Sequence, residues 1–178
     1  MPSFTITANT TEINLQLAQL SQRVGDLQPA YEDIGESLTI LIDTFFKTGI
    51  GADGQPWQAN AFSTTQNYIK ARGGYTANGK LNKRGQVLAG SKKVLQGITG
   101  ELRRTIFYQA LNDSLIVGSP SMYAAIQNFG GAFKAWGKST QQMPARPFMP
   151  VDQNGNLYPK ARTIILRRLQ THLQTSLK

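Results

Sequence analysis

The chain has 178 residues, carries 19 Lys and Arg against 10 Asp and Glu, and therefore has a formal net charge of +9. Its length and a hydrophobic content of 40% suffice for one folded domain with a buried core, which excludes a mainly disordered chain. The absence of cysteine excludes disulfides, thiolate metal sites and a cysteine nucleophile, and no apolar run approaches the ~20 residues that span a bilayer. No secretory signal is recognisable, so we expect a cytoplasmic product without membrane contact.

The charge is unevenly distributed along the chain. Residues 1–53 hold seven acids against two bases, a balance of −5, whereas residues 54–178 hold three acids against seventeen bases, a balance of +14. Such asymmetry indicates either a nucleic-acid surface or copies of the chain that meet acidic face to basic face. Composition alone leaves both alternatives open.

The first 54 residues predict a strand, two helices and a turn. Residues 3–8 alternate apolar and polar side chains, as a short strand does. A helix follows Asn9, ends at Gly25 and has one apolar face: Ile13, Leu17, Leu20, Val24. A second helix begins near Pro29 and is predicted to bury a stripe of residues three and four apart: Tyr31, Ile34, Leu38, Leu41, Phe45. Residues 49–54 spell G-x-G-x-x-G, but they follow a helix rather than a strand, so they predict a turn and no nucleotide site.

The middle of the chain is basic and rich in glycine. Residues 70–104 hold nine Lys and Arg against Glu101 alone, and the glycines predict that much of residues 71–98 is a long, mobile loop. Residues 106–118 predict a β-hairpin with Asn112 and Asp113 in its turn. Residues 121–129 predict a short helix that buries Tyr123, Ile126 and Phe129, and a flexible basic loop is expected after it.

Residues 143–150 contain three prolines and predict a stiff, extended segment, which we call the proline rail. Each proline ring fixes φ near −65°, removes a backbone donor and pushes the preceding residue to extended geometry. The rail therefore presents Arg146 and Phe148 at fixed positions. Residues 152–156 begin like a calcium loop but lack its glycine and its final glutamate, so they predict a turn. A last helix begins at Pro159 with an apolar stripe: Ile165, Leu169, Leu173, Leu177.

Together these elements predict a single α+β domain over residues 1–178. An antiparallel sheet of about four strands would be flanked by two long N-terminal helices and a C-terminal helix, with the basic stretch as a long loop insertion. Catalytic chemistry is sparse, because His172 is the only histidine and few carboxylates remain after Asp53. We expect no enzymatic activity, no cofactor and no metal site.

Several short motifs, taken in order, resemble those of the phage virion morphogenesis family, the tail completion proteins of Mu-like contractile-tailed bacteriophages. They run from the second helix to the rail: Ile34-Gly-Glu36, Asp53-Gly-Gln-Pro-Trp57, Thr99-Gly-Glu-Leu-Arg103, Val117-Gly-Ser119, Tyr123-Ala124, Gln127-Asn-Phe-Gly-Gly131, Pro144-Ala-Arg-Pro-Phe148. The family often has histidine where this chain has Gln127, and the stretch 71–93 is longer than the family pattern.

The resemblance implies a virion protein of the tail or neck, assembled in the bacterial cytoplasm. Subunits of this kind form a ring, usually hexameric, at the head–tail junction, where they meet neck, tail-tube and sheath proteins. We expect four residues to contact a neighbouring subunit or the tail: Arg146, Phe148, Trp57, Phe129. Five bases are expected to contact DNA in the channel or a neighbour: Lys80, Lys83, Arg84, Lys92, Lys93. The alternative is a free, non-specific DNA-binding protein that uses residues 70–104.

Overall fold

The computed structural model describes residues 14–15, 18, 27–96, 100–135 and 139–176. Its elements are, in chain order, α2 (Gln28–Thr48), α3 (Phe62–Lys70), α4 (Lys83–Ser91), α5 (Glu101–Arg104), β1 (Phe107–Ala110), β2 (Leu115–Gly118), α6 (Ala124–Phe129), β3 (Gly131–Ala135), β4 (Ser139–Met143) and α7 (Pro159–Ser176). The fold is α+β, as predicted. The predicted strand at 3–8 and the apolar face of the first helix lie outside the described residues, although Asn14, Leu15 and Ala18 are helical.

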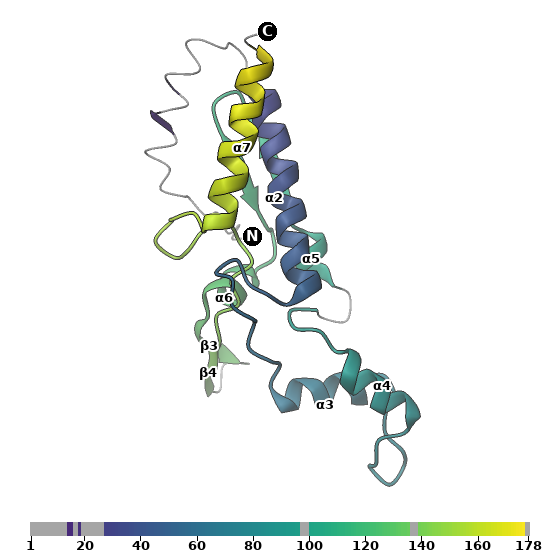
Figure 1. The fold of residues 1–178 in the computed structure, drawn as a ribbon. Coiled ribbons are helices and arrows are strands. Elements are labelled where there is room, and N and C mark those ends of the chain that lie inside the picture. The colour runs from purple at the N-terminus through teal and green to yellow at the C-terminus, as the bar shows by residue number, and fades with distance from the viewer. Residues whose placement is uncertain (1–13, 16–17, 19–26, 97–99, 136–138, 177–178) are drawn as a thin grey trace.

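Helices α2 and α7 lie side by side and form a long column (Figure 1). The predicted stripe of α2 is confirmed, since Tyr31, Ile34, Leu38 and Phe45 are buried and Leu41 is partly buried. Burial of this face by α7 removes apolar area from water, which is the main stabilising term of such a pair. From α7 the side chains of Ala161, Ile165 and Leu169 complete this cluster.

The predicted hairpin at 106–118 is confirmed and packs against α2. Strands β1 and β2 pair in antiparallel register from Phe107 opposite Gly118 to Ala110 opposite Leu115. The hairpin reaches α2 at Gly35, where an added Cβ would lie 2.3 Å from Cδ2 of Tyr108. Glycine is therefore needed at this helical position because the tyrosine ring occupies the space of a side chain.

The described strands form two separate two-stranded antiparallel sheets, β1–β2 and β3–β4, rather than one sheet of four. The prediction of a flexible loop after α6 was wrong, since β3 and β4 pair from Gly131 opposite Met143 to Ala135 opposite Ser139. Most described side chains of this hairpin are exposed on both faces. It therefore lacks the apolar alternation by which a strand is recognised in a sequence.

Part of the segment predicted as loop, 71–98, is also helical. Helix α4 is capped by Asn82, whose side-chain oxygen accepts a hydrogen bond of 2.8 Å from the backbone N–H of Gly85. A Cβ on Gly85 would lie 2.0 Å from the carbonyl oxygen of Gly74. Two of the glycines that suggested mobility thus allow close packing. We call residues 62–93, which comprise α3, the turn and α4, the basic arm.

Helix α6 buries a different face from the one predicted. Ala124 and Asn128, four residues apart, are buried, whereas Tyr123 is 64% exposed and Ile126 and Phe129 are partly buried. The helix begins after Tyr123, so the tyrosine lies outside its buried face.

The predicted turn at 152–156 and the predicted start of the last helix are confirmed. Residues 152–156 form a turn in which the Asp152 carboxylate accepts hydrogen bonds from the backbone N–H groups of Asn154 and Asn156, both at 2.8 Å. Helix α7 begins at Pro159, and Leu173 of its predicted stripe is partly buried while Leu177 lies outside the described residues.

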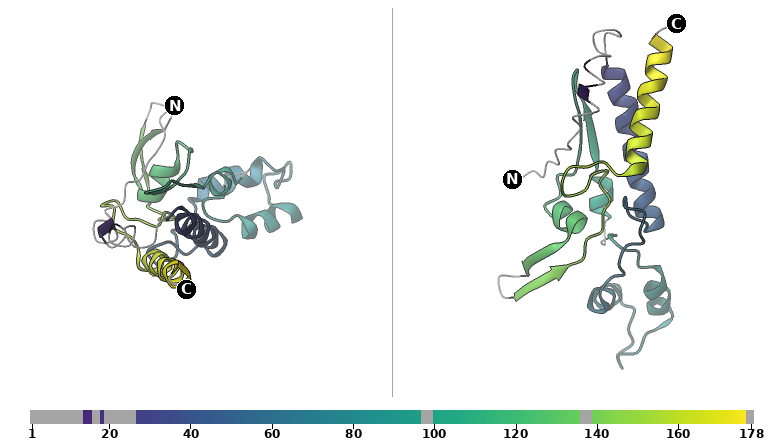
Figure 2. Two further views of the ribbon diagram at one scale, coloured as in Figure 1. Left: turned by 90° about the horizontal axis from the view of Figure 1, so that it is seen from above. Right: turned by 60° about the vertical axis from the view of Figure 1, so that its left-hand side comes forward.

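Two projections extend beyond the C-terminal end of α2. The basic arm lies on one side and the β3–β4 hairpin on the other (Figures 1 and 2). A second core cluster lies where the two projections join α2. Its buried residues are Ile42, Phe45, Phe46, Ala52, Trp57, Ala124, Phe148 and Met149.

Candidate functional site

Hydrogen bonds to its backbone hold the proline rail from two sides. On one side, the carbonyl oxygen of Pro147 accepts from the backbone N–H of Ala52 at 2.9 Å and from the indole Nε1–H of Trp57 at 3.0 Å. On the other side, Oδ1 of Asn128 accepts from the backbone N–H groups of Phe148 and Met149, both at 2.8 Å. The rail is thus fixed to the turn at 49–57 and to α6.

This arrangement places Phe148 in the core. Its ring is 0% exposed and lies 5.3 Å from the ring centroid of Phe46, which in turn contacts Trp57 edge-on at 5.4 Å. Such aromatic contacts add to the stabilisation from buried area. Phe148 is 0% and Trp57 7% exposed, so both side chains pack in the core of this subunit, and their direct contact with a partner stays a prediction.

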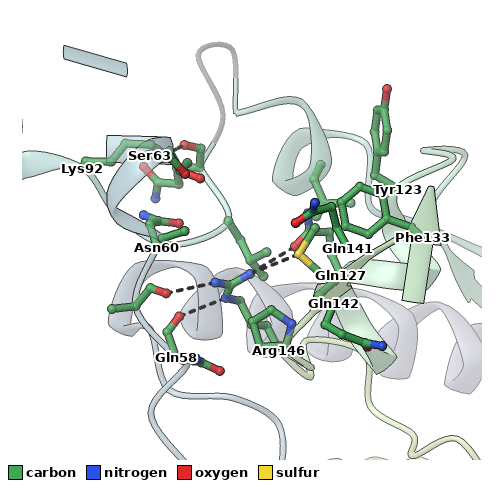
Figure 3. Close-up of a pocket in the computed structure, with 18 of the residues that line it drawn as sticks. Gln58, Asn60, Ser63, Lys92, Tyr123, Gln127, Phe133, Gln141, Gln142 and Arg146 are labelled. Carbon is green, nitrogen blue, oxygen red and sulfur yellow. Dashed lines mark hydrogen bonds between the residues drawn. The ribbon is translucent and has the colours of Figure 1, made fainter. Parts of the chain in front are cut away.

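Arg146 lies at the floor of a groove with a volume of about 870 Å³ between the two projections (Figure 3). Its Nε donates to the carbonyl oxygen of Gln58 at 3.0 Å, Nη2 donates to that of Ala59 at 3.2 Å, and Nη1 makes longer contacts with Gln127 Oε1 and Met143 Sδ. Burial lowers the pKa of Arg146 from its usual range, but a guanidinium remains charged at any physiological pH.

All of these acceptors are neutral, so within the described part of the chain the charge of Arg146 is balanced by dipoles rather than by a carboxylate. The side chain links the segment before α3 to the proline rail, and its contact with Met143 reaches the end of β4. Arg146 is 6% exposed, so little of its side chain is open to the groove.

The groove walls are mainly uncharged and combine apolar surface with side-chain amides. Six amides line them: Gln58, Asn60, Gln96, Gln127, Gln141, Gln142. Tyr123 and Phe133 add aromatic surface (Figure 3), and Phe129, the fourth predicted contact, is only partly buried at the end of α6. Amides and aromatic rings suit hydrogen-bonded, partly apolar protein contacts. Among the residues that the structure describes, no group of three or more His, Asp or Glu is placed to hold a metal ion.

The five predicted DNA-contacting bases divide into two groups. Lys80, Lys83 and Arg84 are exposed at the turn and the start of α4. Lys92 and Lys93 lie beyond its other end, where they line a second, basic pocket. A nine-residue helix is ~13 Å long at 1.5 Å per residue, so the two groups are separate surfaces.

The basic pocket also contains residues that the sequence did not place together. Tyr68 and Arg72 enter from the end of α3 and its following turn, and Arg103 and Arg104 from α5. Counting bases along the chain identified a basic segment but gave no reason to pair residues about 30 positions apart.

The chain belongs to the phage virion morphogenesis family, whose model matches residues 8–174. It is thus a structural or assembly protein of the bacteriophage virion and works with other virion components. No curated protein and no solved structure matches the chain. Within the described residues, no helix is both long and apolar enough to cross a membrane.

Proposed function

We propose that this chain is a tail completion or terminator subunit that forms a ring, hexameric in the simplest case, at the head–tail junction. The ring joins the tail tube and sheath of a contractile tail to the head. The family match over nearly the whole chain carries this proposal. The role requires no catalysis, cofactor or metal.

The uneven charge along the chain supports a head-to-tail ring. Glu32 and Glu36 are exposed on α2, whereas the basic arm holds seven Lys and Arg and no acid. A heterologous contact between an acidic and a basic surface generates a ring when its rotation closes. Complementary charges also favour the correct register between neighbours.

The exposed apolar residues near the groove are the best candidates for the contact itself. Met122 is 68% exposed, and the adjacent Tyr123 lines the groove. Large exposed apolar and aromatic side chains are typical of interface anchors. We therefore propose a contact role for these residues ahead of Phe148 and Trp57.

Disruption of the gene in its phage, followed by electron microscopy of the lysate, tests the proposal. Filled heads beside unattached tails of normal length would establish a completion role, and overlong tails would establish a terminator role. Intact, infectious particles would refute both.

Complementation of that disruption with a Met122→Ser, Tyr123→Ser double variant tests the interface. We expect that the variant subunit folds but that the lysate contains heads without attached tails. The matched control is Val87→Ser on α4, which removes an equally exposed apolar side chain from the basic arm and should complement normally. Equal complementation by both would refute the assigned contact.

Non-specific contact with DNA is the second candidate function, and the uncompensated charge of the basic arm favours it. From Asp53 to Glu101 the chain has no acidic residue. Such a surface binds backbone phosphates without reading sequence, and its affinity falls steeply with salt. A duplex-binding assay with the isolated chain across a salt series tests it, and the absence of binding at low salt would refute it.

A further inference from the structure

The basic pocket has a volume of about 550 Å³ and lies where the basic arm meets α2 and α5. Five cations line it: Arg72, Lys92, Lys93, Arg103, Arg104. Asp43 is the single acid among the lining residues. The pocket is therefore strongly positive.

Asp43 already forms ion pairs with two cations, Lys47 and Arg103. Its carboxylate accepts from Nζ of Lys47 at 2.7 Å and from Nε of Arg103. These hydrogen bonds, first from Arg103 and then from Lys47, lower the pKa of Asp43 and keep the carboxylate ionised. The acid is consequently not available to the cations on the arm side of the pocket.

Arg72 and Lys92 face the same aromatic ring. The guanidinium carbon of Arg72 lies 4.0 Å from the ring centroid of Tyr68, and Nζ of Lys92 lies 5.1 Å from it. Nη1 of Arg72 is buried and has no hydrogen-bond acceptor among the described residues. Burial and the nearby charge of Arg72 lower the pKa of Lys92.

The other contacts leave this charge uncompensated. Among the residues that the structure describes, the acceptors of Lys92 are the backbone carbonyl oxygens of Lys93 and Gln96, and Lys93 donates to that of Lys47 at the C-terminal end of α2. Two like charges against one ring repel each other, and a buried donor without an acceptor costs free energy. An anion in the pocket offsets the first cost, because it attracts both Arg72 and Lys92.

We propose that the pocket formed by Tyr68, Arg72, Lys92 and Lys93 is a binding site for a phosphate group. Phosphate oxygens match the planar fork of a guanidinium and accept from several donors at once. The pocket is larger than an isolated phosphate, which fits a phosphate carried on a chain. The backbone of DNA is the source we infer, since it carries many phosphates and the same arm presents a second, separate group of exposed basic side chains: Lys80, Lys83, Arg84.

The face of Tyr68 that Arg72 covers is closed to a nucleobase. The site therefore recognises phosphate and not sequence. This inference deepens the DNA-contact candidate above, but phosphate binding itself does not depend on that candidate or on the ring.

Titration of the full-length chain with inorganic phosphate and, separately, with a short DNA duplex tests the site. Calorimetry gives the affinities, and NMR of the Tyr68 ring reports occupancy. We expect Arg72→Gln and Lys92→Gln each to weaken phosphate binding about tenfold, the effect of one lost charge-assisted hydrogen bond. The matched control is Lys80→Gln, an exposed base on the same arm outside the pocket, which should leave phosphate affinity unchanged. Circular dichroism melting confirms that each variant is folded.

Each outcome bears on the proposal. Weaker binding of both phosphate and duplex in the pocket variants supports the site and DNA as the source of its phosphate. Weaker binding of phosphate alone, with unchanged duplex affinity, supports the site but refutes DNA as the source. The absence of saturable phosphate binding, or equal loss in the Lys80→Gln control, overturns the site. If Arg72→Gln alters self-association while phosphate does not bind, a carboxylate of a neighbouring copy occupies the pocket and the proposal is wrong. The phenotype of the gene disruption is independent of all four results.

Discussion

Replacement of Asn128 by alanine should detach the proline rail from α6. The side chain is 1% exposed, and its Oδ1 accepts two backbone hydrogen bonds of 2.8 Å, from Phe148 and Met149. In Asn128→Ala both N–H groups lose their acceptor while Phe148 stays in the core. We therefore expect a loss of stability that far exceeds that of an ordinary surface substitution.

The size of the loss follows from the two orphaned donors. A buried donor without an acceptor costs ~1–3 kcal/mol, so two cost ~2–6 kcal/mol. Part is offset, because Nδ2 of Asn128 is itself buried without an acceptor among the described residues and the substitution removes it. The net loss should be about 3 kcal/mol, or about 6–12 °C in Tm for a chain of this length.

Urea denaturation of the purified subunit, with thermal melting beside it, measures this loss. Gln127→Ala is the matched control, since Gln127 is adjacent on α6 and, among the described residues, its side chain accepts just the 3.5 Å contact from Arg146. We expect the control to lose less than ~1 kcal/mol. A loss in Asn128→Ala no larger than that of the control would refute the role of Asn128 as the anchor of the rail.

Three further predictions concern the core, the groove and pH. Gly35→Ala should destabilise the subunit by ~1–3 kcal/mol through the clash with Tyr108, but should stabilise the Tyr108→Ala variant by ~1 kcal/mol. Gly90→Ala, with open space around it, should stabilise the wild type. Denaturation of the wild type, the three single variants and the double variant checks both expectations. Arg146→Lys should lower the free energy of unfolding by ~2–4 kcal/mol, because an ammonium cannot reach the carbonyl oxygens of both Gln58 and Ala59. Equal stability of variant and wild type in denaturation would contradict the view that Arg146 bridges these segments. Asp43 has a lowered folded pKa, so its stabilisation is present above its unfolded pKa and is lost as pH falls through the folded value. Asp43→Asn should therefore be less stable than wild type near neutrality, and this difference in stability should begin to narrow below about pH 4, as melting across a pH series would show.

Much of the column of helices was predictable from the sequence. The stripe that includes Tyr31 and Leu38 repeats with the period of a helix, and Pro159 marks where α7 begins. The β1–β2 hairpin was equally accessible, since Asn112 and Asp113 specify a turn through local backbone preferences. Each of these signals depends on residues within one or two turns of chain.

The candidate site was only partly predictable. The rail was recognised because proline restricts its own backbone wherever it occurs. The position of Arg146 at the floor of a groove could not be predicted from the sequence, because its partners Gln58 and Ala59 are nearly ninety positions away in the chain. The exposure of Tyr123 was mispredicted for the same reason, since burial depends on what packs against a helix.

The sequence by itself determined the family, the α+β class, the major helices and the first hairpin, because ordered motifs, periodicity and turn chemistry are local properties of the chain. Only the tertiary structure decided that Phe148 and Trp57 are core residues, that the glycines of the basic arm pack closely, and that Tyr68 and Arg72 meet Lys92 in one pocket. These facts arise from contacts between segments far apart in the chain. Such contacts are selected by the free energy of the whole fold rather than by any single stretch of it.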